Sequence, residues 1–184
     1  MQTPKIRYAD DGHESIGTLL NLRAPALIFG LMLGIGISFV TSRFEEVLAH
    51  SVQVAFFMPF IVYISDAVGT QTEAIYSRDL KTGKAKFKVY LRKEFSLGVI
   101  IGIVFGLISG LITWFWLGDA QLSLSVAIAS CVAITTAPVV ALIIAYLFQS
   151  AHRDPAASTG PIATVLQDML SVVIYGVVAS LIIL

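Results

Sequence analysis

Five long apolar stretches alternate with short polar segments along this chain. The apolar stretches cover residues 24–40, 52–68, 95–117, 122–149 and 161–184. A helix needs about 20 mainly apolar residues to cross the roughly 30 Å hydrocarbon core of a bilayer. We therefore expect an all-α membrane protein whose five transmembrane helices form one domain over residues 24–184.

The polar segments between these stretches are too short to fold by themselves. Residues 1–23 read as a short tail, in which 15–22 has apolar residues at helical spacing and predicts a short helix at the membrane surface. Residues 41–50 read as a loop. Nothing breaks the second helix before Gly83, a residue suited to a helix C-terminus, so that helix is expected to continue past Glu73. No separate extramembrane domain is expected.

Small residues and prolines predict how two of the helices pack. Gly98, Gly102, Gly106 and Gly110 recur at every fourth position of the third stretch. In a membrane such a ladder forms a flat groove that lets a neighbouring helix approach closely. The fourth stretch contains Pro138 near its middle, which predicts a kink there.

Composition excludes a soluble enzyme. The chain is 57% hydrophobic and 13% charged, whereas a soluble domain has about 25% charged residues. The single cysteine, Cys131, excludes an intrachain disulfide and cannot form a thiolate metal site by itself. The first residues are polar and do not resemble a signal peptide. We expect no catalysis, since no nucleophile–base pair is visible, and no nucleic-acid partner.

The basic residues predict the orientation in a cell (inner) membrane. If the N-terminus is cytoplasmic, eleven of the twelve lysines and arginines lie on the inside and only Arg43 lies outside. Cytoplasmic loops are enriched in these residues. The prediction is therefore a cytoplasmic N-terminus and an external C-terminus.

Asp168 is the strongest candidate for a functional residue. It lies about two turns inside the fifth stretch, where a carboxylate costs at least about 2.5 kcal/mol to insert. Thr164, Asp168, Ser171 and Tyr175 recur at helical spacing and form one polar stripe, so Ser171 and Tyr175 are expected to line a pore with it.

The other candidate groups are also carboxylates. Asp66 lies near the inner end of the second stretch, Glu73 follows it on the inner side, and Glu45 and Glu46 lie at the expected outer mouth. Oxygen ligands suit hard cations such as Mg²⁺, with Mn²⁺, Co²⁺ and Ca²⁺ as alternatives. One carboxylate per chain balances only half the charge of a divalent ion, whereas two chains around a two-fold axis would supply two carboxylates. A homodimer in the lipid bilayer is therefore expected.

Two other functions are compatible with the same residues. In a proton-coupled solute transporter, Asp168 would take up and release a proton, although no inverted repeat supports this. In a non-transporting assembly subunit, the glycines and polar residues would serve only packing. Asp168 as part of a helix–helix hydrogen bond fits that second alternative.

Several motifs together resemble one known family. They are L-R-A-P, S-R-F-E-E-V-L, F-F-M-P-F-I-V-Y-I-S-D-A-V-G-T-Q-T-E-A, R-K-E-F-S-L-G-V-I-I-G-I-V-F-G and D-P-A-A-S-T-G-P-I-A-T-V-L-Q-D. The sequence resembles the membrane domain of the magnesium transporter E (MgtE) family, which is related to the animal solute-carrier magnesium transporters. The resemblance covers the chain from about Leu22 to its end.

The resemblance implies a homodimer of five-helix protomers with a cation pore along its axis. It implies that Asp168 binds Mg²⁺ in the pore, with the main-chain carbonyl of Thr164 as a supporting ligand. Where the family often has G-G-N, this chain has Ser65-Asp66-Ala67, which makes Asp66 a candidate second ligand. Only about twenty residues precede the first stretch here, so the family's cytoplasmic sensor is not expected in this chain, and a separate soluble regulator is a candidate partner.

Overall fold

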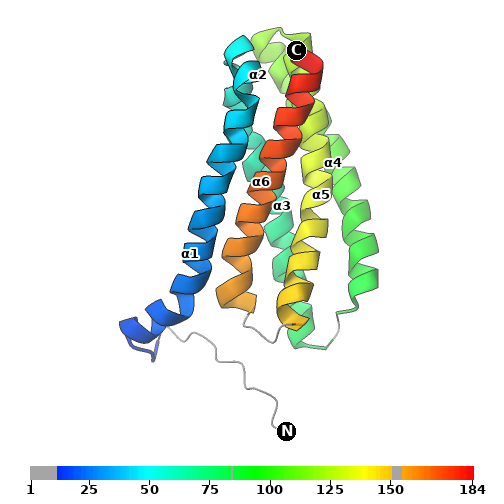
Figure 1. Ribbon diagram of the computed structural model, residues 1–184. Helices are drawn as coiled ribbons and strands as arrows, with labels where there is room; N and C mark the ends of the chain where they lie inside the picture. The colour runs from blue at the N-terminus through cyan, green and yellow to red at the C-terminus, as the bar shows by residue number, and fades with distance from the viewer. Residues whose placement is uncertain (1–11, 84, 151–154) are drawn as a thin grey trace.

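The computed structural model describes residues 12–83, 85–150 and 155–184, and all elements in those ranges are helices (Figure 1). The elements are α1 (Ile16–Thr41), η1 (Ser42–Phe44), α2 (Glu45–His50), α3 (Val54–Lys81), α4 (Phe87–Leu117), α5 (Ala120–Ser150) and α6 (Pro155–Ile183). Five helical segments are long and apolar enough to cross a membrane. The predicted all-α fold with five spans is confirmed.

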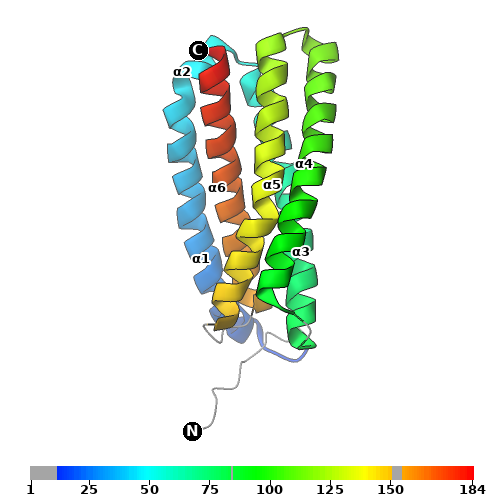
Figure 2. The ribbon, with the colours of Figure 1, turned by 90° about the vertical axis from the view of Figure 1, so that its right-hand side faces the viewer.

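The long helices stand side by side as one elongated bundle. In Figure 1, α6 lies between α1 and α5, α4 lies at the far edge beside α5, and α3 runs behind α6 and α5. Figure 2 shows the same order from the side and a bend in α5, the helix that contains Pro138. The start of α1 and the end of α6 lie at opposite ends of the bundle. It stays a prediction that the end of the bundle where α1 starts faces the cytoplasm.

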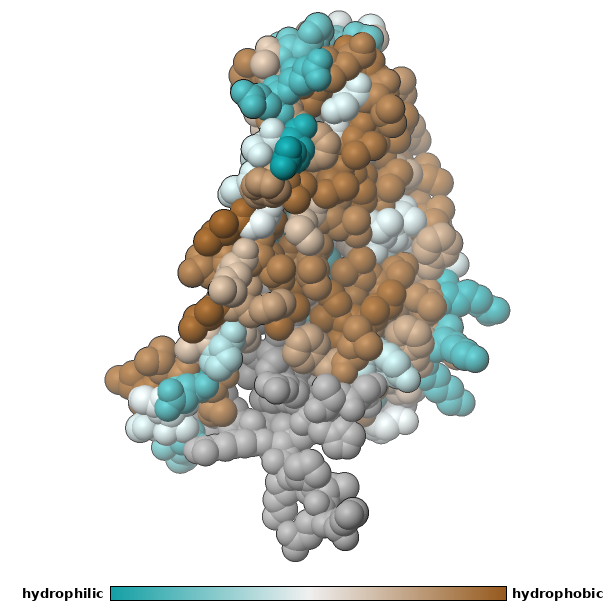
Figure 3. All heavy atoms as spheres, in the orientation of Figure 1, coloured by the Kyte–Doolittle hydropathy of each residue, from teal (hydrophilic) through white to brown (hydrophobic). Residues whose placement is uncertain are grey.

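The surface of the bundle matches a lipid environment. Figure 3 shows a broad apolar band between polar groups at the two ends. Many of the large apolar side chains of α1 and α4 are exposed in the protomer, among them Met32, Ile35, Phe39, Leu107 and Phe115. Such a surface is suited to contact with acyl chains or with neighbouring membrane helices.

The N-terminal boundary of the first span differs from the prediction. Residues 16–41 form one continuous helix, and Figure 1 shows its first turns at an angle to the rest of α1, projecting from the bundle. The predicted helix at 15–22 is therefore joined to the first span, and its location at a membrane surface stays a prediction. Ser15 caps this helix, because its hydroxyl accepts a hydrogen bond of 3.3 Å from the Thr18 N–H. Pro25 therefore lies inside the helix. Membrane helices tolerate an internal proline because neighbouring groups can satisfy the freed backbone carbonyl.

The segment predicted as a loop at 41–50 is mostly helical. It forms η1 and α2, and Val47 is buried in the core of the bundle. A helix lets this short connection bury an apolar side chain while its backbone groups remain hydrogen-bonded. The predicted extension of the second span is confirmed, since α3 runs to Lys81 and Gly83 follows it with a φ of 71°.

The glycine ladder of α4 packs directly against α5. A Cβ atom on Gly102 would lie 2.6 Å from the Cys131 carbonyl oxygen, and one on Gly106 would lie 2.6 Å from the Ala127 carbonyl oxygen. Gly98 and Gly110 face the same helix. The predicted groove for a neighbouring helix is therefore confirmed, and α5 is the helix that fills it.

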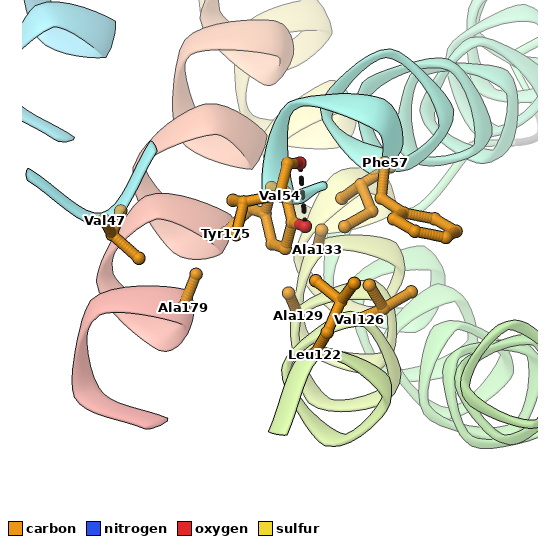
Figure 4. Close-up of a cluster of buried hydrophobic side chains, with 10 residues drawn as sticks. Val47, Val54, Phe57, Leu122, Val126, Ala129, Ala133, Tyr175 and Ala179 are labelled. Carbon is orange, nitrogen blue, oxygen red and sulfur yellow. Dashed lines mark hydrogen bonds between the residues drawn. The ribbon is translucent and has the colours of Figure 1, made fainter. Parts of the chain in front are cut away.

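The main apolar core lies where α2, α3, α5 and α6 meet (Figure 4). Its buried members are Val47, Val54, Phe57, Ile61, Leu122, Val126, Ala129, Ala133, Tyr175 and Ala179. Figure 4 shows the ring of Tyr175 reaching from α6 to the first turn of α3, where its hydroxyl donates a 2.9 Å hydrogen bond to the Val54 carbonyl oxygen. This contact ties the C-terminal half of α6 to α3.

Removal of the Tyr175 hydroxyl is expected to destabilise the bundle. A buried hydrogen bond contributes about 0.5–1.5 kcal/mol net, so Tyr175→Phe should lower the free energy of unfolding by about that amount. Denaturant titration in bicelles would measure the difference. Tyr63→Phe is the matched control, because Tyr63 is 71% exposed. An equal effect of both substitutions would contradict a structural role for the Tyr175–Val54 contact.

Candidate functional site

The predicted ligands meet where α3 and α6 cross inside the membrane-spanning region. Asp66 comes from α3 and Asp168 from α6, and both residues are partly buried. The two carboxylates lie close enough to repel each other electrostatically. The side chain of Thr164, one helical turn before Asp168, hydrogen-bonds to the Asp66 carboxylate. The structure thus brings together the three residues that the sequence indicated as metal ligands.

A close helix contact beside these residues sets the spacing of α3 and α6. Gly69 lies three residues after Asp66 on the same side of α3. A Cβ atom at this position would lie 1.6 Å from Oε1 of Gln167, so the carboxamide of Gln167 rests on the bare backbone of α3. Any larger residue at 69 would displace that carboxamide. The glycine therefore allows a long polar side chain from α6 to reach the surface of α3.

Polar atoms without partners gather at this crossing. Among the described residues, the buried side-chain atoms that find no hydrogen-bond partner are Oδ1 of Asp66 and both polar atoms of Gln167. Gln167 is 2% exposed. A buried polar group without a partner costs about 1–3 kcal/mol, so these atoms make the α3–α6 crossing a costly polar region in the isolated protomer.

A third carboxylate lies two turns further along α3. Glu73 is partly buried and close enough to Asp66 to be repelled by it. Its neighbour Thr72 faces the other way, and its hydroxyl donates a 2.7 Å hydrogen bond to Glu94 of α4. Asp168, Asp66 and Glu73 thus form a series that leads from the crossing toward the end of α3.

The outer half of the predicted polar stripe is buried inside the protomer. Ser171 is 2% exposed and Tyr175 is 0% exposed, and the Tyr175 hydroxyl already has a partner in α3. Their assignment as pore-lining residues stays a prediction. Glu45 and Glu46 are exposed in the first turn of α2, at the end of the bundle where α6 ends, and their role at an outer mouth also stays a prediction (Figure 1).

The chemistry of the crossing is that of a site for a hard cation. Its polar groups are carboxylate, hydroxyl and carboxamide oxygens, which suit Mg²⁺ and related ions. No basic side chain among the described residues contributes to the electrostatic environment of Asp168. No three carboxylate, imidazole or thiol groups of the described protomer converge on one point. A divalent ion at Asp168 would therefore keep much of its water or take ligands from a second protomer.

Sequence reasoning missed two residues of this crossing, Gln167 and Gly69. Gln167 precedes Asp168 and is a polar residue in an apolar helix, which is a usable signal. It follows Thr164 by three residues and precedes Ser171 by four, so it borders the polar stripe of α6, and helical spacing could have selected it. Gly69 has no comparable signal, since nothing in the sequence shows which residue would rest on it.

Comparison with known proteins finds a matching family model and similar curated proteins. Residues 58–178 match the family MgtE, described as a divalent cation transporter. The magnesium transporter MgtE of Bacillus subtilis (strain 168) is 31% identical to the chain over 161 residues, and that of Enterococcus faecalis (strain ATCC 700802 / V583) is 30% identical over 162 residues. Each alignment covers 86% of this chain and 36% of the relative. The chain therefore spans about a third of the length of these relatives.

Proposed function

Because the chain belongs to the MgtE family of divalent cation transporters, we propose that this multi-pass membrane protein is a homodimeric pore or transporter for Mg²⁺. The observation that supports this proposal most directly is the pairing of Asp168 with Asp66 within the spans, in an environment to which no described basic side chain contributes. Carboxylates at membrane depth usually face a partner, a water-filled path or an ion. Both relatives are named as magnesium transporters.

In the proposed mechanism the ion lies between the Asp168 carboxylates of two protomers. Two carboxylates match the charge of one divalent ion, and the Thr164 carbonyl and the Asp66 carboxylate add oxygen ligands or accept hydrogen bonds from its water. Mg²⁺ dehydrates reluctantly and needs only one or two carboxylates when it keeps several waters. Glu73 would then receive the ion on its way toward the inner end of α3.

The membrane potential supplies the proposed driving force. Moving one charge across 100 mV is worth about 2.3 kcal/mol, and a divalent ion gains twice that. Inward movement therefore needs no chemical reaction and no catalytic residue. The Mg²⁺ gradient alone would decide the direction when the potential is zero.

Voltage-clamped proteoliposomes test the proposal. The purified protein is reconstituted, a potassium gradient with valinomycin sets the potential, and Mg²⁺ uptake is followed with an internal fluorescent indicator. We expect uptake that rises as the interior becomes more negative, and light scattering of the detergent-solubilised protein should give the mass of a dimer. Parallel measurements with Mn²⁺, Co²⁺ and Ca²⁺ give the order of preference.

Two outcomes of this experiment would favour other functions. Uptake that follows an imposed proton gradient at zero potential would favour the proton-coupled solute transporter. No uptake of any divalent ion by a well-folded dimer would favour the assembly subunit. Either result would overturn the proposed Mg²⁺ pore.

A further inference from the structure

We propose that the outward face of the first two turns of α4 binds the phosphate headgroups of anionic phospholipids. This face carries Lys88, Arg92 and Lys93, and all three side chains are exposed. Figure 3 shows hydrophilic side chains that project from the edge of the bundle where α4 starts. The surface is separate from the α3–α6 crossing, so its role does not depend on the proposed ion path.

Packing of the opposite face of α4 fixes the direction in which these basic side chains point. Phe87 and Tyr90 pack against buried residues of α3 and α5. The Tyr90 hydroxyl also donates a hydrogen bond to the Asp79 carboxylate near the end of α3. Lys88 and Arg92 are four residues apart, so they lie on one face of the helix, and their exposure shows that this face is turned away from the bundle.

The length of α4 places this face at the level of the lipid headgroups. The helix has 31 residues, which corresponds to about 46 Å, whereas the hydrocarbon core of a bilayer is about 30 Å thick. Trp114 and Trp116 are exposed near its other end, and tryptophan is enriched at membrane interfaces. Counted back from these tryptophans, about 20 residues span the core, which ends near Phe95. The three basic residues therefore lie just beyond the core, where lipid phosphates are found.

The positive charge of this face is not neutralised within the described part of the chain. The structure shows no ion pair for Lys88, Arg92 or Lys93 among the described residues. The Asp79 carboxylate, by contrast, pairs with Arg78 at 2.9 Å. Basic residues at a membrane surface are attracted to anionic headgroups. Charge complementarity therefore favours phosphatidylglycerol and other anionic lipids over zwitterionic ones.

Apolar side chains on the same face fit a lipid partner better than a soluble one. Val89 and Phe95 are exposed between and beside the basic residues. A helix surface that combines basic and apolar residues binds in the boundary between headgroups and acyl chains. A soluble acidic protein would contact the basic groups but would leave the apolar ones without a partner.

Native mass spectrometry of the detergent-solubilised protein with equimolar phosphatidylglycerol and phosphatidylcholine tests the proposal. Each lysine or arginine near an anionic surface strengthens binding roughly fivefold, so we expect the wild type to bind phosphatidylglycerol about 10- to 100-fold more tightly than phosphatidylcholine. The variant Lys88→Gln/Arg92→Gln/Lys93→Gln should bind the two lipids about equally. The preference of the wild type should also fall as the salt concentration rises.

Single substitutions at Arg92 and Arg43 provide a matched comparison. Arg43 is also exposed, but it lies at the opposite end of the bundle, where its guanidinium is 4.7 Å from the centre of the Phe39 ring (Figure 1). Arg92→Gln should lower the preference for phosphatidylglycerol about fivefold, whereas Arg43→Gln should leave it unchanged. Arg92→Lys keeps the charge and should keep the preference.

Thermal stability in nanodiscs gives a second measurement. A ligand that binds only the folded protein raises its thermal midpoint. The wild type should therefore unfold at a higher temperature in nanodiscs that contain phosphatidylglycerol than in phosphatidylcholine alone. The triple variant should show no such difference.

Several results would overturn the proposal. These are equal binding of the two lipids by the wild type, and an unchanged preference in a folded triple variant. If the triple variant does not fold, equal preferences of Arg92→Gln and Arg43→Gln overturn it. A thermal midpoint raised by inorganic phosphate in detergent without lipid would assign the face to a soluble anion instead.

Discussion

Asp168→Asn should reduce voltage-driven Mg²⁺ uptake by at least about 100-fold, since an ion pair at roughly 5 Å and an effective dielectric constant near 20 represents several kcal/mol of attraction. The substitution keeps the size of the side chain and its capacity for hydrogen bonds, and it removes one charge from each protomer. The fold should persist, because Asp168 is only partly buried and has a carboxylate, Asp66, as its electrostatic neighbour. Initial rates in voltage-clamped proteoliposomes would measure the effect.

Two further substitutions test whether uptake depends on the charge of Asp168 and on its position. Asp168→Glu keeps the charge but moves it by one methylene, so its rate should lie between those of the wild type and Asp168→Asn. Asp119→Asn is the control for a general effect of a lost carboxylate, because Asp119 accepts the Leu122 N–H at the start of α5, far from the crossing. Wild-type uptake by a folded Asp168→Asn dimer would remove Asp168 from the ion path.

Gly106→Leu should prevent stable assembly of the bundle. Even a Cβ atom at Gly106 would lie 2.6 Å from the Ala127 carbonyl oxygen and 3.0 Å from the Cβ of Cys131. These are backbone and short side-chain atoms of α5, so the helices must separate to accept any side chain. Gly106→Ala should cost about 1–3 kcal/mol by overpacking, and leucine should cost more. Yield of monodisperse protein and denaturant midpoints would report the loss.

Gly36→Ala provides the comparison for the glycine ladder. No atom lies within 4 Å of a Cβ added to Gly36, so the same change of residue should leave the free energy of unfolding nearly unchanged or raise it slightly. Similar midpoints for Gly36→Ala and Gly106→Ala would contradict close packing of α4 on α5. A large difference would show that the ladder holds these two helices together.

Asp66 gives the crossing a feature that the family resemblance does not supply. Where the resemblance implies G-G-N, this chain has a carboxylate that lies near Asp168 and hydrogen-bonds to Thr164. A second negative charge raises the attraction for a divalent ion and increases the repulsion that Asp168 experiences when the site is empty. The ion preference measured for this chain will therefore depend on both carboxylates.

The sequence by itself determined the class of the protein, the number of spans and the principal charged residue. These conclusions depend on local properties: the length of an apolar stretch, the spacing of glycines and the rarity of a carboxylate at membrane depth. The helix ends were less accurate. The segment at 41–50 was predicted as a loop but is helical and packs in the bundle, because backbone hydrogen bonds near a membrane are satisfied best within a helix.

Only the tertiary structure decided which polar residues meet. Helical spacing places Thr164, Asp168, Ser171 and Tyr175 on one stripe, yet the ring of Tyr175 enters the core and binds the Val54 carbonyl oxygen. Gln167, at the border of that stripe, instead reaches Gly69 of α3. Spacing along one helix shows which residues share a face, whereas the neighbour that covers each face is fixed by contacts between residues about a hundred positions apart. The meeting of Asp66, Thr164 and Asp168, on which the proposed ion site depends, belongs to that second kind of information.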